Sequence, residues 1–392
     1  MRVVKPLLLA LGFGLSATAL AATQIQLDSS AKGAVINKNI YGQFAEHLGR
    51  GIYEGLWVGP DSKIANTKGF RNDVLAALKD LHVPLIRWPG GCFADEYHWR
   101  DGVGPKDKRP VKLNTNWGGV EEDNAVGTHE FFDLVELLGA EAYVNGNLGT
   151  GTPQEMAEWL EYMTAEGKSS LAEFRRKYGR VKQFKVHYFG VGNEAWGCGG
   201  NMSVEYYTNL YKHYTTFLKT PANNTPKWIA SGSHSEDTSW ADYMTANIKQ
   251  KMDAVSFHYY TLPTGKWDVK GAALQFPESE WISTMQRTLA MDGFITNNKK
   301  VMDKHDPEKK VGFYVDDDND VDRAVTKLPR KNGYPTWTVT VPPDFRVMTR
   351  FLPDCCIDWT LLGLMGTFTI LAVGNMVSAF RAATLPVFRF LI

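Results

Sequence analysis

The chain has 392 residues, of which 44% are apolar and 22% are charged, so its length allows one large domain or two ordinary ones. This composition excludes a disordered chain and a collagen. The 43 basic and 43 acidic side chains cancel, which leaves no global field for nucleic acid and no broad cationic surface for anionic lipid. A neutral partner fits better, and the 12 Trp, 16 Tyr and 20 Phe could stack on sugar rings or fill an aromatic core.

The first residues resemble an export signal. Arg2 and Lys5 precede an apolar run over residues 7–15, and the small residues Ala19 and Ala21 follow. Residues 1–21 are therefore predicted to be a cleaved signal peptide. The protein would then be periplasmic or secreted, and the alternative is an uncleaved anchor. Only four Cys occur, without the spacing of a zinc site, and so few predict a fold that does not depend on a disulfide framework.

From about residue 36 to residue 317, short apolar runs alternate with segments of helical period. The runs predict buried parallel strands, which end within residues 43–46, 85–88, 142–145, 189–192, 228–230, 255–257 and 312–315. Helices are predicted at 72–81, 130–138, from Pro153 to about 163, 204–218, 240–248 and 281–304. This alternation is typical of a (β/α)8 TIM barrel, and a doubly wound open sheet is the alternative.

Polar side chains end most of the predicted strands, which packing alone explains poorly. Such barrels build their active sites at the carboxyl ends of the strands. The residues at these ends are Glu46, Arg87, Asn145, Asn193, Glu194, His258 and Tyr260. They are the candidate site.

The pattern stops after the seventh strand, near Asp317. No Glu, Gln or His follows Glu308, and the helical period disappears, so the barrel is predicted to be incomplete. We therefore divide the chain into a catalytic domain at 22–317 and a divergent tail at 318–392. Within the tail, 334–341 alternates like one strand, and the uncharged stretch 359–380 is long enough to be a transmembrane helix.

The most informative segment is Phe189-Gly-Val-Gly-Asn-Glu-Ala-Trp-Gly-Cys-Gly-Gly-Asn-Met202. A strand delivers Asn193 and Glu194 to the rim, and six small or glycyl positions around them would let a ligand approach the backbone. Glu194 is a candidate proton donor and Asn193 a candidate donor to a substrate hydroxyl. In the alternative, structural interpretation, Glu194 pairs with Arg87.

This segment resembles the acid/base motif of the α-L-arabinofuranosidases of glycoside hydrolase family 51, retaining enzymes built on a (β/α)8 barrel. Further segments resemble the family in the same order, namely 41–54, 87–102, 114–119, 127–131, 147–151 and 257–261. The resemblance covers roughly residues 24–317. It implies an exo-acting enzyme that removes terminal arabinofuranosyl groups from hemicellulose or pectin, needs no metal or cofactor, and forms a homo-oligomer.

Carried over residue by residue, the resemblance implies a role for each position. Glu194 would be the general acid/base and Asn193 a contact to the 2-hydroxyl of the sugar. Glu46 would bind the arabinose, and Cys92 would line the subsite, although an inert buried thiol is equally compatible with the sequence. His258 and Tyr260 would flank the second carboxylate, unless His258 is an ordinary core histidine.

The resemblance fails at the second carboxylate. A retaining glycosidase needs two carboxyl groups, one to protonate the leaving oxygen and one to attack the anomeric carbon. The family places a Glu followed by Trp at the end of the seventh strand, whereas this chain has Asp317 there and continues with further Asp residues. Asp317 is one methylene shorter, which moves the carboxylate back by about 1.5 Å. The family's eighth strand and C-terminal β-sandwich have no counterpart after residue 317.

Three explanations of the tail are open: a shifted reading frame, a fusion junction, or a membrane anchor at 359–380. An incomplete barrel leaves a strand edge unpaired, so we expect this chain to be poorly soluble or to aggregate. The alternatives to an active arabinofuranosidase are an inactive arabinoside-binding remnant of the family and another retaining glycosidase of the same superfamily that acts on pyranosides.

Overall fold

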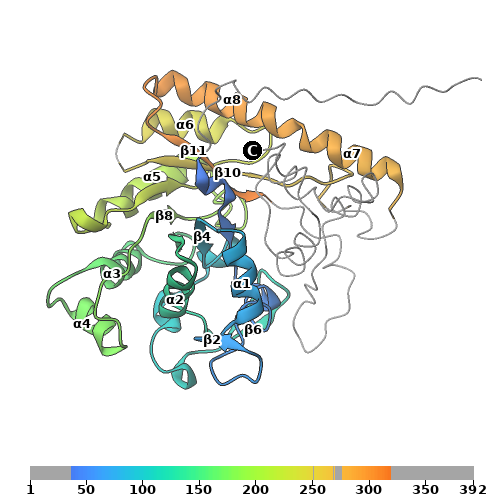
Figure 1. Cartoon of the computed structure of the whole chain (residues 1–392). Helices are drawn as coiled ribbons and strands as arrows, with labels where there is room; N and C mark the ends of the chain where they lie inside the picture. Colours follow the sequence, from blue (N-terminus) through green and yellow to red (C-terminus); the bar gives the residue numbers. More distant parts are fainter. Residues whose placement is uncertain (1–36, 250, 268, 270–275, 319–392) are drawn as a thin grey trace, which may run out of the picture. The chain divides into compact units, whose positions relative to one another are not determined.

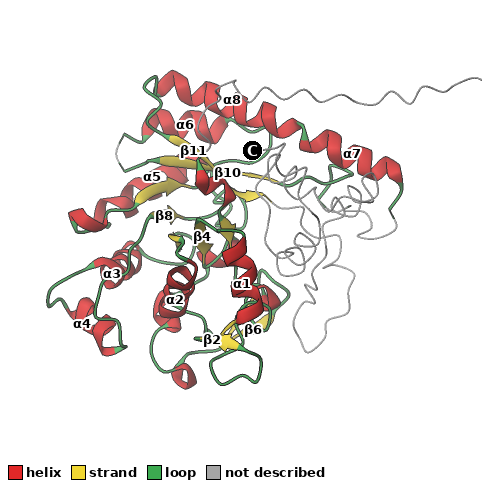
Figure 2. Ribbon diagram, in the orientation of Figure 1, coloured by secondary structure: helices red, strands yellow, loops and turns green. Residues whose placement is uncertain are grey.

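Seven parallel strands follow one another in the sheet in the same order as in the chain (Figure 2). The computed structural model describes residues 37–249, 251–267, 269 and 276–318. The strands are β1 (Gln43–Phe44), β4 (Leu85–Trp88), β7 (Glu141–Gly146), β8 (Tyr188–Val191), β9 (Lys227–Ala230), β10 (Ala254–Tyr259) and β11 (Gly312–Asp318). A doubly wound sheet would reverse its strand order. The single winding therefore confirms the barrel prediction over the alternative.

Helices connect the strands and cover one face of the sheet (Figure 1). They are α1 (Asn72–Asp80), α2 (Thr128–Leu138), α3 (Pro153–Thr164), α4 (Ser170–Lys177), α5 (Val204–Phe217), α6 (Ser239–Asn247), α7 (Glu278–Thr288) and α8 (Ala290–His305). Successive helices pack side by side, with α1 against α2, α3 against α5, α5 against α6, and α6 against α8. A continuous layer of helices on the outside of a parallel sheet is the barrel arrangement.

Along strand β4, successive side chains belong to two different apolar clusters. Ile86 and Trp88 of β4 belong to the large cluster under the helices. Leu85 of the same strand belongs to a small cluster with residues of β7, β9 and β10. Because successive side chains of a strand point to opposite faces, the small cluster occupies the inner face of the sheet. The inner face continues towards the strand ends with Arg87, which is also buried.

Local signals explain where the helices begin. The Thr152 side chain accepts a hydrogen bond from the Glu155 N–H, and Pro153 occupies the first turn of α3. This is the N-terminal pattern that favours helix formation. The Ser203 hydroxyl caps α5 in the same way, through the Tyr206 N–H. The predicted helix starts at 153 and 204 are confirmed.

Two predictions about helices need correction. The single helix predicted over 281–304 is divided at Leu289, where ψ is −20°, so α7 and α8 are separate; amphipathic periodicity continues across such a break and does not reveal it. The helix α4 was not predicted. Its mean polarity is high because it carries Glu173, Arg175, Arg176 and Lys177.

Short elements complete the fold on the loops. Two hairpins pair β2 (Asn66–Thr67) with β3 (Phe70–Arg71), and β5 (Lys112–Asn114) with β6 (Val120–Glu122). The short 3-10 helices are η1 (Lys38–Tyr41), η2 (Gly49–Gly51), η3 (Cys92–Asp95), η4 (Trp99–Gly102), η5 (Lys106–Lys108) and η6 (Ala222–Asn224). The element η3 follows β4 directly and carries two residues of the site described below.

Several predictions fall outside the described residues. They concern the signal peptide at 1–21, the strand at 334–341, the span at 359–380 and everything else after residue 318. Among the described residues, none of the helices is long and apolar enough to cross a membrane. The proposed boundaries of the catalytic domain and the tail stay predictions.

Candidate active site

Glu194 lies just beyond the end of β8, the fourth strand of the sheet, and is 8% exposed. Its Oε1 atom is 2.7 Å from His258 Nδ1 on β10. Its backbone φ is +40°, a left-handed conformation that is unfavourable for a glutamate and is typical of functional sites. The structure therefore brings together two residues that are 64 positions apart in the chain.

Asn193 is oriented by Arg87. The Arg87 guanidinium donates to Asn193 Oδ1 at 2.5 Å, and it lies 4.7 Å above the centre of the Phe44 ring. Because the amide oxygen is occupied by a cation, the amide nitrogen of Asn193 is the end that can donate to a ligand. This arrangement suits a donor to a sugar hydroxyl, the role that the resemblance implies for Asn193.

Glu46 is held from the turn that follows β4. Its Oε1 atom accepts hydrogen bonds from the backbone N–H groups of Gly91 at 2.9 Å and Phe93 at 3.0 Å. Gly90 has φ of +154°, and a Cβ atom there would lie 2.5 Å from Glu46 Cγ. Only glycine fits this position, so the Gly-Gly pair before Cys92 lets the chain wrap closely around the Glu46 carboxylate.

Cys92 forms a disulfide with Cys198, with a Cα–Cα distance of 5.5 Å. The interpretation of Cys92 as an inert thiol is therefore wrong. The bond joins η3 to the loop after β8, across 106 residues of sequence. Four cysteines allow three pairings, and sequence alone does not choose among them.

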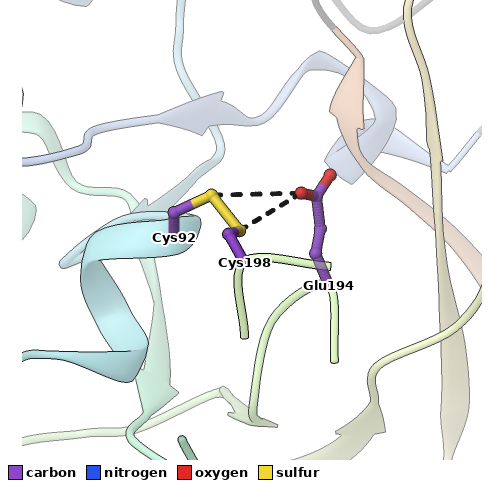
Figure 3. A group of neighbouring side chains, drawn as sticks. All are labelled: Cys92, Glu194 and Cys198. Atoms are coloured by element: carbon purple, nitrogen blue, oxygen red, sulfur yellow. Dashed lines mark hydrogen bonds between the residues drawn. A yellow bond between two sulfur atoms is a disulfide. The ribbon is translucent and has the colours of Figure 1, made fainter. Parts of the chain in front are cut away.

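The disulfide lies against Glu194 (Figure 3). Glu194 Oε2 is 3.4 Å from Cys198 Sγ and 4.0 Å from Cys92 Sγ. A disulfide sulfur carries no proton to donate, so only a protonated Glu194 could form a weak hydrogen bond here, as donor.

Asp95 was not predicted as a site residue, although it connects three strand ends. Its Oδ1 atom accepts from the N–H groups of Leu148 at 2.7 Å and Gly149 at 2.8 Å, and its Oδ2 atom accepts from the Asn193 N–H at 2.8 Å. Burial raises the pKa of Asp95 to about 7, and the three backbone donors and Arg87 oppose this rise. Asp95 therefore fixes the backbone that carries Asn193.

A second unpredicted group, formed by His47, Glu122, Trp88 and Tyr53, lies behind Glu46. His47 is fully buried, and its Nδ1 atom is 3.1 Å from Glu122 Oε2. Trp88 Nε1 donates to His47 Nε2 at 2.9 Å, so the ring is neutral and carries its proton on Nδ1. Tyr53 also donates to Glu122. No spacing in the sequence relates these four residues.

At two positions of the 189–202 segment, glycine is needed because another part of the chain lies close to its backbone. A Cβ atom at Gly190 would lie 2.0 Å from Asn145 Oδ1. At Gly199 it would lie 1.8 Å from the Asn193 carbonyl oxygen and 2.8 Å from Asp95 Oδ2. At these positions the close neighbour is another part of the chain, so the prediction that the glycines make room for a ligand is wrong there.

Tyr260 and Asp317 lie at neighbouring strand ends. Tyr260 follows β10, and its ring is 5.4 Å from that of the exposed Trp267. In β11, the seventh strand, Asp317 pairs with His258 of β10. The backbone thus places the predicted nucleophile position beside the strand whose histidine contacts Glu194. A second aromatic contact near the rim, between Trp196 and His234 at 4.0 Å, was not predicted.

Comparisons with known proteins identify similar sequences over much of the chain. The family model described as "Alpha-L-arabinofuranosidase 1 domain" matches residues 77–270. The intracellular exo-alpha-L-arabinofuranosidase of Bacteroides ovatus is 49% identical over 314 residues, which are 80% of this chain and 60% of that protein. Alpha-L-arabinofuranosidase C of Emericella nidulans is 48% identical over 162 residues, 41% of this chain and 32% of that protein.

Solved structures are similar as well. The GH51 arabinofuranosidase from Xanthomonas axonopodis pv. citri has a TM-score of 0.74 and 53% identity, over 77% of this chain and 61% of that one. The arabinose complex of the Thermotoga maritima enzyme has a TM-score of 0.64 and 32% identity, over 80% and 62%. The chain spans about three fifths of the length of the Bacteroides relative. It belongs to the GH51 family of α-L-arabinofuranosidases.

Proposed function

We propose that this protein is a retaining, exo-acting α-L-arabinofuranosidase that releases terminal arabinofuranosyl groups from hemicellulose or pectin. The observation that carries the proposal is the buried Glu194 at the end of the fourth strand, with His258 at 2.7 Å and Asn193 oriented by Arg87. A buried carboxyl group beside an oriented amide donor is what acid/base chemistry on a sugar requires.

Glu194 acts twice in this proposal. It first protonates the leaving oxygen while the second carboxylate attacks the anomeric carbon, and it then removes a proton from the water that releases the sugar. His258 holds one oxygen of the Glu194 carboxyl group and thereby fixes its direction. Asn193 donates to the 2-hydroxyl, and Glu46 accepts from a further hydroxyl of the arabinose.

The position of the nucleophile belongs to Asp317. Because its side chain is one methylene shorter than that of glutamate, its carboxylate stands back by about 1.5 Å, and a displacement of about 1 Å can cost about 100-fold in rate. We therefore propose an enzyme whose first chemical step is slow. The alternative favoured by the same residue is a remnant that binds arabinosides without cleaving them.

Chromogenic substrates test the proposal. The chain should hydrolyse an aryl α-L-arabinofuranoside faster than aryl β-D-xylopyranoside or β-D-glucopyranoside, and Glu194→Gln should abolish that hydrolysis. A preference for a pyranoside would favour another retaining glycosidase. Binding of arabinose in calorimetry without any turnover would favour the remnant.

We also propose that the protein is exported, on the basis of the N-terminal pattern at residues 1–21. The Bacteroides relative carries the word intracellular in its name, so the two proteins would differ in location. Fractionation of the producing cells tests this proposal. Recovery of the chain in the cytoplasm with Met1 still present would contradict it.

A further inference from the structure

Two sulfur atoms and one carboxylate oxygen gather beside the acid/base position (Figure 3). The candidate ligand atoms of Cys92, Cys198 and Glu194 all lie within 4.8 Å of one another. Glu194 is buried, Cys92 is partly buried and Cys198 is exposed. An ion could therefore reach the group from the side of Cys198. Among the residues that the structure describes, this is the one such group of three.

The distances fit a tetrahedral ion once the disulfide is open. Zinc binds sulfur at about 2.3 Å and carboxylate oxygen at about 2.0 Å, so tetrahedral angles place sulfur and oxygen about 3.5 Å apart. The observed Sγ–Oε2 distances are 3.4 Å for Cys198 and 4.0 Å for Cys92. Two sulfurs on one zinc stand about 3.8 Å apart, a separation that side-chain rotation can supply when the Cα atoms are 5.5 Å apart.

We propose that reduction of the Cys92–Cys198 disulfide creates a binding site for a thiophilic divalent cation such as Zn²⁺ or Cd²⁺. A dithiol supplies two electrons and two protons, the S–S bond breaks to give two thiols, and the dithiol is itself oxidised to a disulfide. The cation then displaces both thiol protons and binds two thiolates and Glu194 Oε2, with water as fourth ligand. Asn193 Nδ2, 3.9 Å from Cys198 Sγ, can donate to that thiolate.

The site would couple the redox state of the chain to its chemistry. A Glu194 carboxylate bound to a cation cannot protonate a leaving group, so the reduced protein would be inhibited by zinc while the oxidised protein would not. This consequence rests on the proposed function. Binding of the cation does not, because it depends only on the three ligand atoms.

Cadmium titration tests the binding directly. All samples carry Cys355→Ser and Cys356→Ser, so that the two remaining cysteines are those of the site. After reduction, Cd²⁺ should bind once per chain and produce a thiolate-to-metal absorption band, and the oxidised sample should give none. Loss of even an outer-shell partner of a metal ligand costs about 10–100-fold in affinity. Glu194→Gln should therefore weaken binding at least about tenfold, whereas Glu236→Gln, an exposed carboxylate on the loop after β9, should not.

Either of two results overturns the proposal: a reduced sample with two free thiols and no band, or equal affinity in Glu194→Gln and Glu236→Gln. A second variant removes the need for reduction, which could itself loosen the fold. Cys92→His cannot form the disulfide and offers a ring nitrogen with Cys198 and Glu194. It should bind Zn²⁺ without reductant at least about tenfold more tightly than Cys92→Ala. Equal affinities of these two variants would also contradict the site.

Discussion

The buried His47–Glu122 pair offers a sharp test of how the site is positioned. In Glu122→Gln, one of the two carboxylate oxygens becomes an amide nitrogen, which can only donate. That nitrogen faces either His47 Nδ1–H, 3.1 Å from Oε2, or the Asn124 N–H, which donates to Oε1 at 3.0 Å. Moving the histidine proton to Nε2 gives no relief, because Trp88 Nε1 donates to that atom at 2.9 Å. One buried donor is thus left without an acceptor in either tautomer, which costs about 1–3 kcal/mol.

The assay is urea unfolding combined with kinetics on an aryl arabinofuranoside. Glu122→Gln should lose about 1–3 kcal/mol of stability. It should also raise KM, because His47 directly follows Glu46 in the chain and helps to fix its position. Glu121→Gln is the matched control, since Glu121 is the exposed neighbour on β6. Adding Trp88→Phe frees His47 Nε2 to carry the proton, so the cost of Glu122→Gln should shrink in that background. Additive effects of the two substitutions would refute the tautomer argument.

Two further predictions concern buried carboxyl groups. Because the pKa of Asp95 is raised to about 7 from 3.8, the folded state holds this proton more tightly than the unfolded state, and its contribution to stability is lost as pH rises through 7. The Asn side chain in Asp95→Asn does not titrate, so the stability of this variant relative to the parent should improve by up to about 3 kcal/mol from pH 5 to pH 8. Urea unfolding of both proteins at both pH values measures this. The same stability difference at pH 5 and pH 8 would contradict the prediction. Glu46→Gln keeps the acceptor for Gly91 and Phe93 but loses the negative charge. Its kcat/KM should fall about 10–100-fold, while its stability should not change. An unchanged kcat/KM in steady-state kinetics would contradict a role of Glu46 in substrate binding.

The strand order and most helices could be predicted because their signals are local. Apolar runs mark the strands, and caps such as Thr152 mark helix starts. The positions of Glu194 and His258 followed from the same logic, since both end a strand. The break at Leu289 has no such signal, because both sides keep the same amphipathic period.

The residues that hold the site were beyond sequence reasoning. Asp95 and Glu122 matter through hydrogen bonds to residues more than 50 positions away, such as Leu148 and Tyr53. A buried carboxylate in a loop looks the same in the sequence as an exposed one. The Cys92–Cys198 disulfide is a similar case, because its partners meet only when β4 and β8 are in place.

The central claim is that Glu194 and the residue at position 317 form the carboxyl pair of a retaining arabinofuranosidase. The most direct measurement is the rate of hydrolysis of 4-nitrophenyl α-L-arabinofuranoside by Asp317→Glu, with the parent and the double variant Asp317→Glu/Glu194→Ala beside it. Restoring the missing methylene should raise kcat by about 100-fold, and the double variant should lose that gain. An Asp317→Glu protein that unfolds at the same urea concentration as the parent and shows no gain, or a gain that survives without Glu194, would contradict the account.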